Sequence, residues 1–329
     1  MPYFLYLFEQ WSINCKGVTI RMKALVLGAT GGMGHAIIKE LTERNIEATA
    51  FARSHAKLEK MFSRHSTVTI HPGDIFTSND IHAAADGVDL IFHAINIPYA
   101  DWEYRLPTMN QNIIAAAKNH SAKLAVADNI YAYGRGDSDK TKETTPKHPH
   151  TKKGKIRLQM ERLFKESEVP YLIAHFPDYY GPHAENAPLN YTLKSVAANK
   201  RTSFVGNPSI AREHIYTPDG AKAIIELALR DDVYNQNWNI PAYDTITGVE
   251  IIEIVRSMAD YKKRVSTITK SMIRFLGFFN KQMREFTEMQ YLNEDPVILS
   301  GKKYEKLIGP VPKTPYSQGI RETMAAYEQ

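Results

Sequence analysis

The chain alternates short apolar runs with stretches in which apolar residues recur every three to four positions. Apolar runs bounded by turn residues are typical of buried strands, and the longer period is typical of helices that bury one face. The predicted strands lie at 23–27, 47–52, 67–71, 89–94, 123–128 and 171–175, and the predicted helices at 32–44, 55–62, 79–86, 106–119 and 152–168. This alternation predicts an α/β protein with a doubly wound parallel sheet between two layers of helices.

After Pro182 the alternation fades. Helices are predicted at 189–198 and 220–229, a strand at 238–240, and further helices from Gly248 onward. We therefore expect residues 22–182 to form the sheet domain, and residues 183–329 to form a smaller, mostly helical portion that is interleaved with the sheet and binds substrate.

Residues 1–21 do not fit this pattern. Their apolar stretch 2–8 lacks a basic segment before it and meets Glu9 at once, which argues against a secretory signal peptide. The strand pattern begins directly after Met22, so we predict that Met22 is the natural start. The alternative is that residues 1–21 form a genuine N-terminal arm.

Composition narrows the class of protein. Of the 329 residues, 43% are hydrophobic and 23% are charged, as in globular proteins, and the net charge of +5 is too small to argue for a nucleic-acid partner. Cys15 is the only cysteine, so no internal disulfide can form and the cytoplasm is the expected compartment. No apolar run approaches the length of about 20 residues that a spanning helix needs, so no membrane partner is expected.

A glycine-rich loop follows the first predicted strand and opens the first predicted helix. Its residues are Gly28, Ala29, Thr30, Gly31, Gly32, Met33 and Gly34. Gly28 allows a sharp turn, Gly31 lets the backbone approach a pyrophosphate, and Gly34 lets helix and strand pack closely. The free N–H groups at the start of the helix then bind the anion. The loop predicts a dinucleotide-binding domain of the Rossmann type.

The spacing of this loop resembles that of the extended short-chain dehydrogenase/reductases, also known as the NAD-dependent epimerase/dehydratase family. Further segments that resemble this family in the same order are 73–75, 91–96, Tyr133-Gly134, 180–182 and 212–221. The resemblance implies that Thr30, Gly32, Met33, Asp74, Ile75, Ala94 and Asn96 also line the cofactor site. It implies an oxidoreductase or epimerase that acts on a carbonyl-containing small molecule or a nucleotide sugar, as a monomer or a homodimer.

The end of the second predicted strand indicates which dinucleotide is preferred. NAD-binding sites carry an acidic side chain there, which binds the ribose hydroxyls and repels a 2′-phosphate. In this chain Ala52 occupies that position and Arg53 follows it. The guanidinium group suits a phosphate, so NADP(H) is favoured over NAD(H). The alternative is that Arg53 is an ordinary surface residue in a turn.

The catalytic positions depart from the family pattern. The family's usual Ser or Thr position falls on Asn129, and no tyrosine occurs between Tyr133 and Tyr171, where the usual Tyr-x-x-x-Lys would lie. Aligning the flanking motifs without a gap places Lys153 in the tyrosine position and Arg157 in the lysine position. It also places Glu161 on the buried side of the helix. A second register would use Thr151 and Lys155.

Two residues are candidates for the proton donor. Lys153 lies at the start of a helix with Arg157 four residues on, and both features favour a neutral amine, like the essential lysine of the isoflavone-reductase branch. Tyr131 follows the fifth strand, at the sheet edge where ligands bind. The alternatives are a solvated Lys153 and a Tyr131 that only walls the pocket. Asn129 either donates its amide to a substrate carbonyl or caps the strand.

The remaining features leave alternatives open. Arg212 matches an arginine that contacts a diphosphate in the sugar-nucleotide branch, or it forms a surface ion pair with Glu213. His148 and His150 have no further ligands at a metal spacing, so no metal site is expected. The apolar segment 272–279 is either a lid or plain helical core.

Two functions remain in competition. The first is an atypical NADP-dependent enzyme, which the intact motifs through Asp219 favour. The second is a non-catalytic NADP-binding redox sensor like the NmrA-like regulators, which the missing tyrosine favours.

Overall fold

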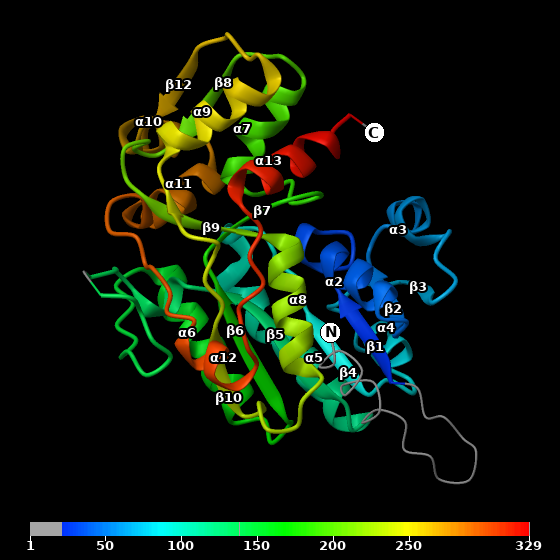
Figure 1. The fold of residues 1–329 in the computed structure, drawn as a ribbon. Coiled ribbons are helices and arrows are strands. Elements are labelled where there is room, and N and C mark those ends of the chain that lie inside the picture. The colour runs from blue at the N-terminus through cyan, green and yellow to red at the C-terminus, as the bar shows by residue number, and fades with distance from the viewer. Residues whose placement is uncertain (1–21, 138, 329) are drawn as a thin grey trace.

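The computed structural model describes residues 22–137 and 139–328, and the expectations for residues 1–21 and for the natural start lie outside or at the border of this part. A parallel sheet with the strand order β10-β6-β5-β4-β1-β2-β3 forms the centre of the lower lobe (Figure 1). Its strands are β1 (Lys23–Leu27), β2 (Glu47–Ala52), β3 (Val68–Pro72), β4 (Leu90–His93), β5 (Lys123–Asn129), β6 (Tyr171–Phe176) and β10 (Gln236–Asn239). The predicted α/β fold with a Rossmann-type sheet is confirmed.

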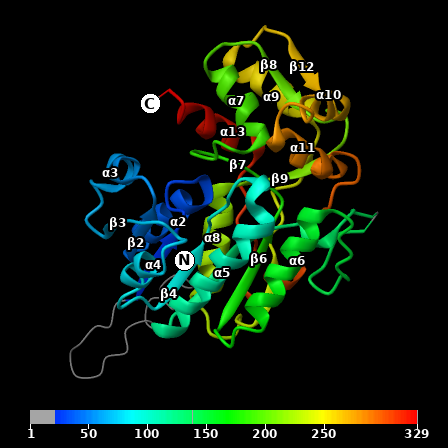
Figure 2. The ribbon, with the colours of Figure 1, turned by 180° about the vertical axis from the view of Figure 1, so that it is seen from behind.

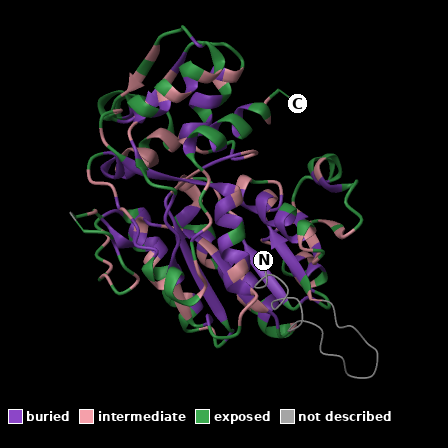
Figure 3. Cartoon of the chain, in the orientation of Figure 1, coloured by how far each residue is buried: buried purple, intermediate pink, exposed green. Residues whose placement is uncertain are grey.

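Helices cover both faces of this sheet, as predicted. One face packs against α2 (Gly32–Glu43), α3 (His55–Phe62) and α8 (Thr217–Ala228), and the other packs against α4 (Ser78–Ala84), α5 (Trp102–Asn119) and α6 (Lys152–Lys165). Figure 2 shows the second layer in front of the sheet. All residues of β4 and β6 are buried, which explains why these strands are continuous apolar runs (Figure 3).

The strand order reverses beside β1, because β2 and β3 continue on one side and β4, β5 and β6 on the other. In open α/β sheets ligands bind at the carboxyl ends of the strands at such a reversal. The sheet also recruits β10, which lies more than 50 residues after the predicted domain boundary and pairs with β6 in parallel. We therefore expect the residues that follow β1, β4 and β5 to line the ligand site.

A second, upper lobe has its own small core. Its helices are α7 (Pro188–Ala197), α9 (Gly248–Ala259), α10 (Lys270–Leu276), α11 (Lys281–Thr287) and α13 (Tyr316–Ala325). Its strands are β7 (Asp178–Tyr180), β8 (Thr202–Val205), β9 (Arg212–Tyr216), β11 (Thr245–Ile246) and β12 (Val265–Ile268). Short 3-10 turns η2 (Tyr99–Asp101), η3 (Tyr131–Tyr133) and η4 (Glu288–Asn293), and the helix α12 (Lys302–Leu307), complete the described elements that are used below.

The structure corrects two sequence predictions. The segment after Gly248 is not purely helical, because β12 pairs in parallel with β8. Helix α5 begins at Trp102 rather than at 106, so that Pro107 lies inside the helix. The prediction had placed this proline at the first turn, which proline favours. No helix in the described ranges is long and apolar enough to cross a membrane.

Candidate functional site

The glycine-rich loop adopts the conformation that its sequence predicts. Gly28 follows β1 with a φ of +85°, a value that favours glycine. A Cβ atom on Gly34 would lie 2.2 Å from the Gly28 carbonyl oxygen, so only glycine lets α2 approach β1 this closely. The first N–H groups of α2 lack intrahelical partners, as at every helix start, and are available to an anion.

Gly32 and Met33 were expected to line the cofactor site, but both pack against other parts of the protein. The Met33 side chain is buried and lies where a Cβ atom on Gly220 would meet it. Gly32 packs against Ala184, since a Cβ atom there would approach the Ala184 Cα to 2.7 Å. Any contact of Gly32 or Met33 with a dinucleotide therefore comes from the backbone. Thr30 lies half-buried between Gly28 and Gly31.

The residues expected at the adenosine end follow β2 and β3. Arg53 is exposed directly after β2, and no carboxylate of the described residues lies within ion-pair distance of its guanidinium group. Asp74 accepts a hydrogen bond from the Phe76 N–H at 3.1 Å, and the Ile75 carbonyl accepts one from Asn112 at 3.0 Å. The Asp74–Ile75 turn is thus held from both sides.

The segment after β4 approaches the glycine loop. A Cβ atom on Gly28 would lie 2.9 Å from the Ala94 carbonyl oxygen. Asn96 is exposed, and its side-chain oxygen accepts hydrogen bonds from the Ile97 N–H and, at 3.4 Å, from Arg157. Ala94 and Asn96 therefore connect the loop to the predicted catalytic helix.

Arg157 is buried below the carboxyl ends of β4 and β5. Its guanidinium group lies 3.2 Å from the Asp128 carboxylate and 4.2 Å from the centre of the Trp102 ring. Its Nε is buried without a hydrogen-bond partner among the described residues. Asp128 and Trp102 fix the plane of the guanidinium group, and the free Nε leaves it one donor for a ligand.

Lys153 is the second residue of α6. Thr151 caps this helix by accepting a hydrogen bond from the Gly154 N–H. The structure corrects the expected surroundings of this lysine. Its ammonium group is buried and forms ion pairs with Glu285 and, at 3.2 Å, with Glu288. The sequence argument had considered only Arg157 and the start of the helix as neighbours and had not included these two carboxylates.

Arg157 does not exert the expected effect on Lys153, because it is itself paired with Asp128. The geometry also separates the two registers. Lys153 and Arg157 are buried on one side of α6, whereas Lys155 is exposed and Thr151 is engaged as the helix cap. Glu161 is buried on the same helix, as the preferred register requires.

Tyr131 and Tyr99 form a pair whose hydroxyl oxygens lie 2.7 Å apart. Burial raises the pKa of Tyr99 to about 12, and burial together with Tyr99 and Asp178 raises the pKa of Tyr131 well above its usual value. Both hydroxyls therefore carry their protons near neutral pH. The Asn129 side-chain oxygen accepts a hydrogen bond from the Tyr131 N–H at 3.0 Å, which caps the end of β5.

A buried cluster of polar side chains lies beside the carboxyl end of β5. Lys147, Glu161 and His175 contact one another, with the Lys147 ammonium 2.8 Å from the His175 Nε2. The other ring nitrogen of His175 lies 3.0 Å from the Asn129 carbonyl oxygen. Burial and the Lys147 charge lower the pKa of His175 to about 4, so the ring is neutral and donates from Nδ1. The cluster thereby orients Asn129.

The alternative for Arg212, a surface ion pair with Glu213 or a neighbour, does not occur, because Arg212 is buried and pairs with Asp178. The Arg212 guanidinium group lies 3.3 Å from the Asp178 carboxylate and donates a hydrogen bond to Asn293. Asp178, the partner of Arg212, also raises the pKa of Tyr131. The diphosphate alternative remains open for Arg212.

Sequence reasoning missed several residues of this cluster, above all Tyr99, Asp128, Asp178, Glu285 and Glu288. Asp128 and Asp178 carry a signal that could have identified them, because each lies at or just after the carboxyl end of a predicted strand. Glu285 and Glu288 carry none, since they reach Lys153 from more than 130 residues away.

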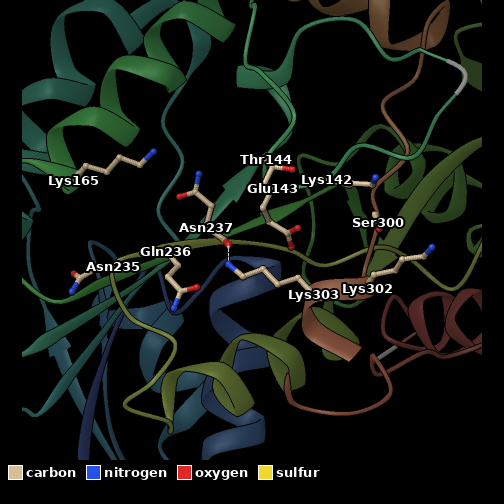
Figure 4. A pocket seen from close by; sticks show the side chains of 10 residues that line it. All are labelled: Lys142, Glu143, Thr144, Lys165, Asn235, Gln236, Asn237, Ser300, Lys302 and Lys303. Carbon is tan, nitrogen blue, oxygen red and sulfur yellow. Dashed lines mark hydrogen bonds between the residues drawn. The ribbon is translucent and has the colours of Figure 1, made fainter. Parts of the chain in front are cut away.

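A cavity of about 160 Å³ adjoins this cluster and is lined by Tyr99, Ala100, Glu103, Tyr104, Lys152, Lys153, Lys281 and Glu285. A cavity of about 470 Å³ lies elsewhere, beside β10 near its amino end, where Lys303 donates a hydrogen bond to the Asn237 carbonyl (Figure 4). Within 22–137 and 139–328 no group of three or more His, Cys, Asp or Glu side chains is arranged to hold a metal ion.

The apolar segment 272–279 is not core. Only Ile273 and Gly277 are buried there, and the phenylalanine rings face solvent. The following helix α11 lies over the candidate site instead, because Glu285 pairs with Lys153 and Phe286 stacks on Tyr99 at 6.3 Å between ring centres. The residues that cover the candidate site therefore come from α11 and not from the apolar segment.

Comparison with known proteins agrees with this fold. Residues 28–215 match the NAD(P)H-binding family. An uncharacterized UDP-glucose epimerase of Bacillus subtilis, YtcB, is 23% identical over 73% of this chain and 83% of its own. The photosystem II assembly factor Ycf39 of Synechocystis is 20% identical over 88% of this chain and 84% of its own. The solved dTDP-glucose 4,6-dehydratase of Bacillus anthracis, in complex with NAD, superposes with a TM-score of 0.76 at 17% identity, over 93% of this chain and 96% of its own.

The chain therefore belongs to the NAD(P)H-binding family. Together with the motifs, these relatives place it in the extended short-chain dehydrogenase/reductase group of epimerases and dehydratases. The predicted family is confirmed.

Proposed function

We propose that the protein is an NADP-dependent oxidoreductase of the epimerase/dehydratase type, acting on a carbonyl-containing small molecule or a nucleotide sugar. One observation carries the proposal. The close-packed glycine loop lies near a cluster of Arg157, Tyr131, Asn129 and Lys153, which is held by buried ion pairs and hydrogen bonds at the carboxyl ends of β4 and β5.

The residues present fit a dinucleotide. Gly34 permits the close approach of α2 to β1, the N–H groups at the start of α2 suit a pyrophosphate, and Arg53 is exposed where a 2′-phosphate would lie. A bound nicotinamide ring would supply the hydride donor or acceptor. Arg53 would favour NADP over NAD, because its guanidinium group can form charge-assisted hydrogen bonds with the additional phosphate.

The chain's own residues would bind and protonate the reacting oxygen. The Asn129 oxygen is engaged with the Tyr131 N–H, so its amide NH₂ is left to donate to a substrate carbonyl. The Tyr131 hydroxyl keeps its proton and can donate a hydrogen bond to the same carbonyl oxygen, in addition to the one from Asn129. Lys153, which pairs with Glu285 beside this cluster, is the other candidate proton donor.

The contact between Lys153 and Glu285 also supports the second candidate function. With its ammonium group buried and paired with two carboxylates, Lys153 is engaged in structure rather than poised for chemistry. A protein that binds NADP without turnover, and reports the redox state of the pool to a partner, needs no proton donor. One of the similar proteins, Ycf39, is named as an assembly factor and not as an epimerase.

Activity measurements distinguish the two functions. We expect the protein to consume NADPH with at least one compound from a panel of ketones, enones and nucleotide sugars. Lys153→Met keeps most of the stem and removes the charge, so it should reduce turnover by about 10²-fold or more while NADPH affinity stays close to normal.

Unchanged turnover in Lys153→Met would transfer the role to Tyr131, for which Tyr131→Phe is the test. Unchanged turnover in both variants would exclude both residues. A protein that binds NADPH tightly but is inert towards the whole panel would support the sensor instead. A protein that does not bind either dinucleotide would contradict both functions.

A further inference from the structure

The upper lobe carries an exposed apolar face on α10 and the turn that follows it. This apolar face consists of Met272, Phe275, Leu276, Phe278 and Phe279. Phe278 and Phe279 are 76% and 80% exposed, and the other three are about half exposed or more. Five large apolar side chains within eight residues form a contiguous exposed patch of the kind that marks an interaction site.

The arrangement of the apolar face is that of a helix with one apolar side. Met272, Phe275, Leu276 and Phe279 are spaced by three, one and three residues, which places them on one side of a helical segment. The rings of Phe275 and Phe279 lie edge to face with centres 5.7 Å apart. Ile273 alone anchors α10 in the protein, so the apolar face is not used for folding.

Basic residues surround this face. Lys270 and Arg274 lie on α10, and Lys281 and Arg284 lie on α11, which packs against α10. Lys270 pairs with Glu294, but within the described part of the chain no carboxylate lies within 4.0 Å of Arg274, Lys281 or Arg284. Lys281 and Glu285 of α11 both line the cavity beside Lys153, so the cations left for the apolar face are Arg274 and Arg284, which lies against Gly277.

We propose that this apolar face docks onto an anionic lipid surface. An amphipathic helix with exposed Phe and Leu on one side and Lys or Arg around it lies in the plane of a membrane interface, with its apolar side among the acyl chains and its cations near the headgroups. The charge is complementary to anionic lipid. A second copy of the chain would instead bring two rims of the same sign together, which is unfavourable.

The position of the face fits this occupant. In Figure 1, α10 lies at the outer left edge of the upper lobe, away from the main sheet. The sequence-based expectation of no membrane partner depended on the lack of a spanning segment, and surface docking needs no such segment. The proposal does not depend on the proposed function, although α11 links the docking face to Lys153 through Glu285.

Vesicle flotation with the full chain tests the proposal. We expect the protein to float with vesicles of phosphatidylcholine mixed with phosphatidylglycerol, and to stay behind with vesicles of phosphatidylcholine alone. Phe278→Ser combined with Phe279→Ser should weaken binding by at least about tenfold, because two exposed rings no longer enter the lipid. Arg274→Glu combined with Arg284→Glu should weaken it as strongly and keep the apolar face.

Matched controls separate docking from general effects. Tyr191→Ser removes an exposed aromatic ring on α7, and Lys39→Glu reverses an exposed charge on α2, so both variants should float like the unaltered protein. Circular dichroism of each variant shows whether it folds, and the charge variants remain informative if the serine variants do not.

Three results would overturn the proposal. The first is that the unaltered protein does not float with the anionic vesicles. The second is equal flotation with both kinds of vesicle, which would remove the role of lipid charge. The third is a dimer in solution that becomes a monomer in the Phe278→Ser, Phe279→Ser variant, which would make the apolar face a contact between copies of the chain.

Discussion

Glu213 on β9 is a buried carboxyl group that forms no ion pair within the described part of the chain, and it makes the stability of the fold depend on pH. Its side chain accepts a hydrogen bond from the Leu299 N–H at 2.8 Å. Burial raises the pKa of Glu213 from 4.5 to about 7, although this hydrogen bond opposes the shift. We predict that Glu213→Gln, which has the same shape and no charge, is more stable than the unaltered protein above neutral pH.

The size of the effect follows from the two pKa values. Between 4.5 and about 7 the folded state binds more protons at Glu213 than the unfolded state, so the free energy of unfolding falls as pH rises. Each pH unit in this window is worth about 1.36 kcal/mol, which gives about 3 kcal/mol in all. Glu213 therefore contributes most below pH 4.5, and this contribution is lost as pH rises through about 7.

Urea denaturation at about pH 5 and about pH 8 measures this difference. The free energy of unfolding of Glu213→Gln, relative to the unaltered protein, should rise by roughly 3 kcal/mol across this range. Glu253→Gln, an exposed glutamate on α9, serves as the control and should show no such trend. A difference that stays constant with pH for Glu213→Gln would refute the reasoning.

Three further predictions concern the cofactor loop, the preferred dinucleotide and the buried cluster. Arg53→Ala should weaken NADP binding by roughly 1.5–3 kcal/mol per lost charge-assisted hydrogen bond and leave NAD binding nearly unchanged, as calorimetry would show; equal weakening of both contradicts the assignment. Gly34→Ala should reduce the affinity for both dinucleotides, because its Cβ atom would displace Gly28; normal binding of either would argue against the close approach. Glu161→Gln should lower the free energy of unfolding by about 3–5 kcal/mol, since it leaves Lys147 buried without its partner, whereas Glu168→Gln, in an exposed pair, should change it little; similar losses would count against a buried pair.

The sequence predicted the parts of the fold that local patterns encode. β1, β2 and α3 have the predicted bounds, because buried parallel strands and one-sided helices leave a clear period in the chain. The short strands β7, β8, β9, β11 and β12 were missed. Each has only two to five residues and is stabilised by pairing with distant segments, which leaves no local period.

The candidate site shows the same division. The glycine loop could be predicted because a sharp turn or a close backbone approach requires glycine at particular positions of the sequence. The geometry of the loop agrees with that prediction. The sequence argument was wrong about the surroundings of Lys153, because it considered only neighbours along α6. Electrostatics depends on distance in space, and Glu285 and Glu288 come from the other lobe of the chain.

The recruitment of β10 into the main sheet has a consequence for synthesis on the ribosome. Every residue of β6 is buried, and β10 covers its outer edge. Until residues 236–239 emerge, a nascent chain that has already formed β1 to β6 exposes an unpaired apolar edge, the kind that pairs with other chains. A fragment that ends at 182 would keep that edge permanently and should aggregate.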